Sequence, residues 1–158
     1  MEKLQNVLRD RKSKTATVNI GVCSGRHEMP VKNFVFDKID DPTDVKTLEE
    51  TAWKWYHDTV LPLKEEGYSV DINIYVTGLT VATVAILKIL THCHEPMLAD
   101  DDNGCQHLLF NGEIFMWYFD AVGKKYYSQS ITEWWIEAIL RSQVTKVLGA
   151  LILSPIYE

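Results

Sequence analysis

Apolar residues recur along this chain with two spacings, one typical of strands and one typical of helices. Short runs rich in β-branched and aromatic residues predict strands over residues 15–23, 31–37 and 70–76. Apolar residues three and four positions apart predict an amphipathic helix over residues 41–60 and a second helix over residues 80–93. Strands that alternate with helices through short connections are typical of parallel βαβ units.

The ends of the first helix are marked by residues with strong local preferences. Asp41 is the expected N-cap and Pro42 the first helical residue. Pro62 is expected to kink or end the helix, and Gly67 to stop it. The second helix, residues 80–93, is apolar nearly all round, so we expect it to be buried between the sheet and another layer.

The pattern changes after a polar loop at residues 95–104. Asn111-Gly112 stands between two apolar runs, which predicts a tight β-hairpin at this dipeptide. Strands over residues 114–119 and 125–131 follow, with Gly123 in the turn between them. The second half of the chain is therefore expected to add an antiparallel ribbon to a parallel core.

Together these elements predict a single α/β domain. We expect a Rossmann-like fold with a parallel or mixed central sheet, an antiparallel β-ribbon extension and flanking helices. Its parts are an N-terminal helical segment (residues 1–14), the α/β core with the ribbon (residues 15–131) and a C-terminal helix (residues 132–158) that is a candidate dimer element. A length of 158 residues suits one domain with a full core.

Charge and composition narrow the classes of partner. The formal net charge is −6, and a protein that follows an extended nucleic acid usually carries a basic face, so the sequence predicts no extended nucleic-acid partner. A compact nucleotide needs only a few local donors and stays compatible with this charge. No apolar run reaches membrane-spanning length, so no membrane partner is expected. The polar N-terminus and three cysteines without a repeated spacing indicate a cytoplasmic protein with reduced thiols.

The turn after the strand at residues 70–76 is the first candidate ligand site. Thr77-Gly78-Leu79-Thr80 joins that strand to the apolar helix, and such a junction offers backbone N–H groups and a helix N-terminus to an anion. Gly78 lets a ligand approach closely, and Thr77 and Thr80 carry hydroxyls. The structural alternative is that Thr80 only caps the helix and Gly78 only makes the turn.

A second candidate turn, Ser24-Gly25-Arg26-His27, follows the strand at residues 15–23. If both strands are parallel, this turn opens at the same edge of the sheet as the first. Arg26 can form a two-pronged bond to phosphate, and His27 can titrate near neutral pH. Lys124-Lys125-Tyr126-Tyr127 on the ribbon is a further candidate, because its cations can contact phosphates and its rings can stack on bases. The alternatives are a solvent-exposed turn and a solvated ribbon end.

No motif of a known catalytic class stands in the sequence, and no cofactor is expected. Any catalysis would depend on the substrate's own hydroxyl, either with acid–base help from His27 or with positioning by Arg26, Thr77 and Thr80. His92-Cys93-His94 and the pair Cys105 and His107 contain zinc-ligand residue types, but neither has the spacing of a zinc site. We therefore expect no metal.

The two turns resemble the ligand loops of the CRISPR-associated Rossmann fold domains and their small ring-nuclease-like relatives. The resemblance covers about residues 15–131. It implies a homodimer that binds a cyclic oligoadenylate across its two-fold axis, either to cleave the ring without metal through the ribose 2′-hydroxyl or only to sequester it in antiviral-defence signalling. The implied ligand-binding residues are Ser24, Gly25, Arg26, Thr77, Gly78, Leu79, Thr80, Lys124 and Lys125, and the implied catalytic residues are His27 and Arg26.

Two other classes of function remain open from the sequence. A non-enzymatic interaction module could use the aromatic pair Trp134-Trp135 of the C-terminal helix to block a partner protein. An enzyme acting on small phosphorylated metabolites could use the same two turns.

Overall fold

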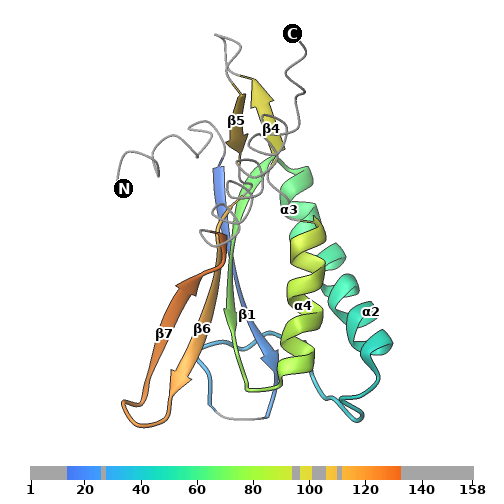
Figure 1. Ribbon diagram of the computed structural model, residues 1–158, viewed down its shortest axis with the longest axis vertical. Helices are drawn as coiled ribbons and strands as arrows, with labels where there is room; N and C mark the ends of the chain where they lie inside the picture. The colour runs from blue at the N-terminus through green and yellow to red at the C-terminus, as the bar shows by residue number, and fades with distance from the viewer. Residues whose placement is uncertain (1–13, 26–27, 94–96, 101–105, 110–111, 133–158) are drawn as a thin grey trace, which may run out of the picture.

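The computed structural model describes residues 14–25, 28–93, 97–100, 106–109 and 112–132 (Figure 1). A five-stranded mixed sheet forms the centre, in the order β2-β1-β3-β6-β7. Its strands are β1 (Lys14–Cys23), β2 (Phe34–Phe36), β3 (Tyr68–Tyr75), β6 (Ile114–Asp120) and β7 (Lys125–Ser130). The first four run parallel and β7 runs antiparallel to β6, which confirms the predicted α/β fold with an antiparallel extension.

The helices between the strands lie on one side of this sheet (Figure 1). They are α2 (Val45–Trp55), a π-helical turn η1 (Tyr56–Val60), α3 (Leu61–Glu65) and α4 (Thr80–Cys93). A separate two-stranded antiparallel sheet consists of β4 (Met97–Asp100) and β5 (Gln106–Leu109). None of the described helices has both the length and the apolar character needed to cross a membrane.

The main core lies between the sheet and these helices. In β3 the side chains of Val70, Ile72 and Ile74 are completely buried, while the residues between them are half-buried. Such alternation is what a strand covered by helices on one side produces. The core also contains fully buried residues from the helices, including Ala52 of α2 and Ile86 of α4.

Helix α4 has the predicted bounds but is not buried on all sides. Val81 is 42% exposed and Val84 is 54% exposed, so the prediction of a fully enclosed helix is wrong. One side of α4 packs on the sheet, α2 covers a second side, and the remaining side faces solvent.

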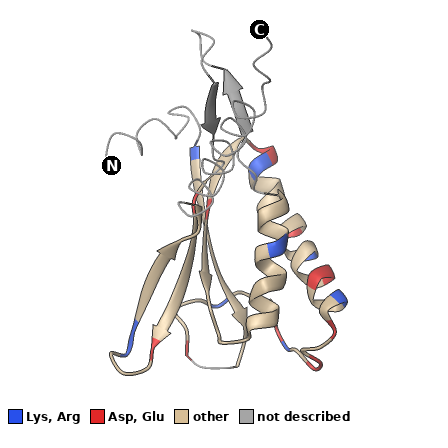
Figure 2. Cartoon of the chain, in the orientation of Figure 1, with Lys and Arg blue, Asp and Glu red and all other residues tan. Residues whose placement is uncertain are grey.

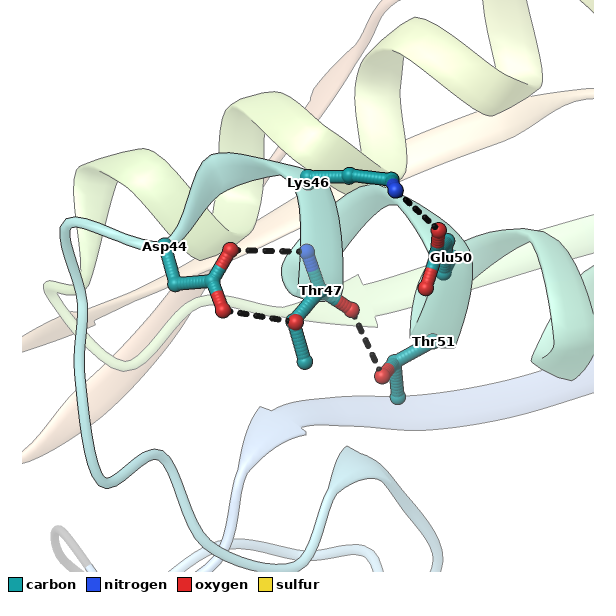
Figure 3. Close-up of polar contacts among 5 residues, drawn as sticks. All are labelled: Asp44, Lys46, Thr47, Glu50 and Thr51. Carbon is teal, nitrogen blue, oxygen red and sulfur yellow. Dashed lines mark hydrogen bonds and ion pairs between the residues drawn. The ribbon is translucent and has the colours of Figure 1, made fainter.

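The start of the first helix differs from the prediction by three residues. Asp44, not Asp41, is the N-cap, because its carboxylate accepts hydrogen bonds from both the backbone N–H (3.1 Å) and the hydroxyl (2.7 Å) of Thr47 (Figure 3). Asp41 instead accepts from the backbone N–H of Thr43 (2.8 Å) in the turn before the helix. Pro42 therefore lies in that turn.

At Pro62 the helical segment does not end but changes type. Proline has no N–H for the next helical hydrogen bond, and here the five residues of η1 take a π-helical form before the chain continues as α3. Gly67 follows α3 with φ +83° and ends the helical segment, as predicted.

Three predictions about strand boundaries are corrected. The predicted strand at residues 31–37 pairs with β1 only over Phe34–Phe36, and residue 37 lies beyond the last pair of the register, Cys23 with Phe36. The polar stretch at residues 95–104 is not wholly a loop, since β4 lies within it. Asn111-Gly112 is not the turn of a hairpin, because β6 pairs with β3 in parallel and β5 pairs with β4.

Gly112 is explained by a close approach between two backbones. It has φ +112°, and a Cβ at this position would lie 1.9 Å from the carbonyl oxygen of Val70. A positive φ and a missing side chain are both required here, so a glycine that suggested a hairpin serves strand packing instead. In the β6–β7 turn the positive φ belongs to Lys124 (+51°) and not to Gly123, the residue predicted to allow the turn.

The two predicted terminal helical segments lie mostly outside the described residues: of the N-terminal one only Lys14 is described, as the first residue of β1, and of the C-terminal one only Thr132. Thr132 is buried, and its hydroxyl accepts a hydrogen bond from the backbone N–H of Ile114 (2.9 Å).

Candidate functional site

The two predicted turns open at the same edge of the sheet. Strands β1 and β3 are parallel neighbours, and their register pairs Gly21 with Tyr75 near the carboxyl ends. Gly25 (φ +72°) and Gly78 (φ +81°) both have left-handed backbones, and no atom of the described residues lies within 4 Å of where a Cβ would be placed. The edge thus holds two exposed backbone turns with open space above each glycine, next to the start of α4.

Thr77 has an unusual position between β3 and α4. The residue is 9% exposed, and its hydroxyl oxygen is buried without a hydrogen bond to any of the described residues. Thr83, one turn into α4, has its buried hydroxyl satisfied because it donates to the carbonyl oxygen of Leu79 (3.0 Å). A buried hydroxyl without a partner costs free energy, so the Thr77 position favours a ligand or water that supplies the missing bond.

Ser24 has a structural role within the predicted site. Its hydroxyl donates to the carbonyl oxygen of Asp37, and its backbone N–H donates to the carbonyl oxygen of Phe36 (3.1 Å). Both bonds tie the end of β1 to the end of β2. The hydroxyl proton is therefore engaged, and Ser24 can offer a ligand only an acceptor.

A cavity of about 260 Å³ lies on the helix side of this edge. Its lining comes from the ends of β1 and β2 and from the turn before α4: Cys23, Ser24, Asp37, Lys38, Ile39, Pro42 and Leu79. A hollow of about 510 Å³ continues along the connection from β2 to α2, where Asp40, Asp41 and Asp44 join the lining.

These two hollows are acidic. Hydrogen bonds from Thr43 lower the pKa of Asp41, and hydrogen bonds from Thr47 lower the pKa of Asp44, so both carboxylates are ionised at neutral pH. Among the described residues of either lining, the one cation is Lys38, which is paired with Asp40. Figure 2 shows acidic residues in the connection that leads into α2. An anionic group is therefore disfavoured inside the hollows and favoured toward the two glycine turns.

An aromatic cluster lies on the opposite side of the same edge. The rings of Tyr75 and Trp117 stack with centroids 5.7 Å apart and planes 13° apart. Tyr126 of β7 meets Tyr75 edge-on at 5.4 Å and Phe119 at 5.2 Å. These four residues, Tyr75, Trp117, Phe119 and Tyr126, are called the aromatic wall below.

Two amides hold the wall in place. The indole N–H of Trp117 donates to the side-chain oxygen of Asn73 (2.9 Å), whose amide N–H donates to the side-chain oxygen of Asn19 (2.9 Å). The Tyr126 hydroxyl donates to the carbonyl oxygen of Glu28 (3.3 Å), which joins the connection after Gly25 to β7. The sequence pointed to stacking at Tyr126 and its neighbour Tyr127, but the other three rings were missed, although aromatic residues at alternate positions of β6 were a signal for them.

The remaining predicted site residues do not all lie beside the two glycine turns. Leu79 lines the 260 Å³ cavity and Thr80 is exposed at the first position of α4. Lys124 and Lys125 lie at the same edge of the sheet, but β7 is three strands from β1, roughly 14 Å away. Lys125 stands over the ring of Tyr127, with its Nζ 4.8 Å from the centroid. Arg26 and His27 lie outside the described residues.

Within the described part of the chain, no three His, Cys, Asp or Glu side chains gather closely enough to hold a metal ion. His92 and Cys93 are described at the end of α4, whereas His94 and Cys105 are not among the described residues. Comparison of the chain with protein-family models, curated proteins and solved structures finds no match. The fold defines an α/β protein with a mixed sheet, and a function has to be argued from the edge described above.

Proposed function

We propose that this protein binds a cyclic oligonucleotide second messenger of the cyclic oligoadenylate class at the carboxyl edge of β1 and β3. The observation that carries the proposal is the pair of open glycine turns on neighbouring parallel strands, together with the buried Thr77 hydroxyl just before Gly78, which has no hydrogen bond to any described residue. The chemical class of the ligand rests on the resemblance of the two turns to the ligand loops of CRISPR-associated Rossmann fold domains.

The phosphate groups of such a ligand are assigned to the Gly78 turn. Backbone N–H groups at the start of α4 and the helix dipole favour negative charge there. The acidic hollow beyond Ser24 keeps phosphates away from the helix side, so the ligand lies across the edge and not inside the cavity. A ring that spans two turns is also the shape that a homodimer can share across its two-fold axis.

Cleavage of the ring is a part of the proposal that needs no metal. The ribose 2′-hydroxyl loses its proton as its oxygen attacks the neighbouring phosphorus, the bond from phosphorus to the 5′-oxygen breaks, and the 5′-oxygen takes up a proton. The products are a 2′,3′-cyclic phosphate and a free 5′-hydroxyl. His27 is assigned the transfer of these protons and Arg26 the charge on the phosphate. Without this step the same site would only bind and sequester the ring, and such a protein is called a sponge.

A small phosphorylated metabolite is the second candidate ligand, and the cavity of about 260 Å³ is its supporting observation. This volume is slightly below the range of about 300–1,000 Å³ that is typical of small-molecule sites. Its acidic neighbours weigh against a phosphate, so the cyclic ligand is the better proposal.

Calorimetry of the purified protein against cyclic di-, tri-, tetra- and hexa-adenylate, with ribose 5-phosphate as the metabolite probe, tests the proposal. Binding of at least one cyclic adenylate, with weaker or no binding of ribose 5-phosphate, is expected. Absence of binding to every cyclic adenylate would overturn the proposed function. Incubation of a bound ring in EDTA, followed by chromatography, separates a ring nuclease from a sponge.

The variant Thr77→Val provides a sharper test, because it removes the unsatisfied hydroxyl and keeps the volume of the side chain. We expect the free energy of unfolding to rise by about 1 kcal/mol, since a buried polar group without a partner is lost. We expect affinity for the cyclic adenylate to fall roughly 10-fold or more, as for a lost hydrogen bond to a charged group. Chemical denaturation and calorimetry measure the two effects.

Thr83→Val is the matched control, because Thr83 is equally buried but its hydroxyl has a partner. It should lower the free energy of unfolding by about 0.5–1.5 kcal/mol and leave ligand affinity unchanged. If Thr77→Val destabilises like the control and binds the ligand normally, Thr77 is not part of the site.

A further inference from the structure

The aromatic wall differs from an ordinary sheet core in how its rings are fixed. Aliphatic residues fill the helix-covered side of the same strands, whereas this side presents rings held by directional contacts. The indole of Trp117 is oriented by Asn73, and the parallel ring of Tyr75 is oriented by Trp117 and Tyr126. Such a surface loses little rotational freedom when another flat ring stacks on it.

The wall is joined to the proposed ligand edge by the chain itself. Tyr75 is the last residue of β3, three positions before Gly78. Tyr126 binds the carbonyl oxygen of Glu28, three positions after Gly25. Phe119, near the end of β6, is 37% exposed and presents part of its ring to solvent. Both turns and the wall therefore belong to one continuous surface at the carboxyl edge.

The charges on the two sides of this edge select different parts of a nucleotide. Carboxylates line the helix side, while the wall consists of neutral rings and amides. In Figure 2 the strands are drawn almost entirely in the colour of uncharged residues, with charges at the turn between β6 and β7. A neutral, flat base fits the wall, and a phosphate fits the glycine turn.

We propose that the aromatic wall is the base-stacking surface of the ligand site, with Phe119 as its exposed contact for a purine ring. This inference rests on the proposed function and specifies which residues hold the base. It also assigns the face of the sheet that bears no described helix to the ligand, in place of the cavity on the helix side.

The test compares Phe119→Ala with Tyr118→Ala. The two residues are adjacent and similarly exposed, at 37% and 40%, but they point to opposite faces of β6. Calorimetry with the cyclic adenylate bound by the wild-type protein should show roughly 5- to 150-fold weaker binding for Phe119→Ala, as is typical when a stacking ring is removed. Tyr118→Ala should bind within about twofold of wild type.

A second measurement guards against an indirect effect on folding. Thermal unfolding of both variants should give similar midpoints, since both rings are partly exposed. The adenylate should also quench the fluorescence of Trp117, and the quenching should disappear in Trp117→Phe. Unchanged affinity of Phe119→Ala, with normal binding by the wild type, overturns this inference and leaves the proposed function standing. If the wild type binds no cyclic adenylate, both fall.

Discussion

The two faces of strand β3 show how one strand can serve two purposes. On the helix-covered face Val70, Ile72 and Ile74 are completely buried in an aliphatic layer. On the other face Asn73 and Tyr75 alternate with them, and each takes part in a directional contact. Burial of aliphatic groups is non-directional and scales with area, whereas hydrogen bonds and stacked rings require a defined geometry. The first face provides most of the stability, and the second defines a surface.

Substitution of Ile72 by alanine should give the largest effect. The side chain is completely buried in the aliphatic layer, so its truncation leaves a cavity. We expect the free energy of unfolding to fall by about 2–5 kcal/mol. Urea denaturation followed by far-UV circular dichroism measures the change.

Asn73→Ala is the matched variant on the other face, one residue along the same strand. It removes hydrogen bonds to Asn19 and Trp117, and we expect a loss of about 1–2 kcal/mol. The near-UV circular dichroism should change more than in Ile72→Ala, because the indole loses its fixed orientation. If Asn73→Ala costs as much stability as Ile72→Ala, the division of roles between the two faces is wrong.

Tyr56 is a residue with a polar group on the helix-covered side of the sheet, and its titration can be tested. Its hydroxyl donates to the carbonyl oxygen of Cys93 (3.0 Å) at the end of α4 and accepts from Lys64 (3.2 Å). Burial, with a smaller effect of the nearby Cys93 thiol, raises the pKa of Tyr56 to about 12. The folded protein therefore keeps this proton at a pH where the unfolded chain has lost it.

The sign of the resulting pH dependence follows from linkage. The contribution of Tyr56 to stability is complete below pH 10 and is lost as the pH rises to about 12. It amounts to at most about 2.7 kcal/mol, and to less where water reaches the hydroxyl. Denaturation of wild type and Tyr56→Phe at a series of pH values should show their difference shrinking across this range. Burial lowers the pKa of Lys64, an effect of opposite sign that both proteins share. A constant difference up to pH 12 would contradict the assignment.

Asp44→Ala should give the smallest effect, at the solvent-exposed start of α2. The carboxylate caps the helix through two bonds to Thr47, and the next turn adds a bond from Thr51 to the carbonyl oxygen of Thr47 (2.8 Å) (Figure 3). Loss of the cap should cost about 0.5–2 kcal/mol by thermal unfolding. Asp41→Ala is the control and should cost less, since Asp41 holds only the preceding turn. Equal costs would show that both residues share the cap.

Local signals were most reliable where a residue acts within its own element. The bounds of α4 were predicted correctly because its apolar run follows a glycine turn and needs no distant contact. The prediction of Asp41 as N-cap was wrong, because Asp44 is an equally good cap by residue type and its bonds to Thr47 decide between the two. The hairpin at Gly112 was wrong for a different reason. A positive φ was required there, but by the backbone of β3 and not by a turn.

In the candidate site, too, some features follow from local sequence signals and others from contacts between distant elements. The two glycine turns could be read from the sequence, since a glycine after a strand is a local feature. Three other features depend on neighbours from other elements. They are the Thr77 hydroxyl without a hydrogen bond to any described residue, the bond that the Ser24 hydroxyl donates to Asp37, and the acidic lining of the hollow. The aromatic wall joins β3, β6 and β7, so its rings are distant along the chain.

By itself the sequence determined the class of fold, the order of its main strands and helices, and the two turns at one edge. These properties depend on periodicity and on the backbone preferences of single residues, which act over a few positions. Only the tertiary structure decided that the described helices cover one face, that Gly112 serves a backbone contact, and that four rings meet beside the glycine turns. Register between distant strands decides such contacts, because one residue of slip would move every side chain to the opposite face.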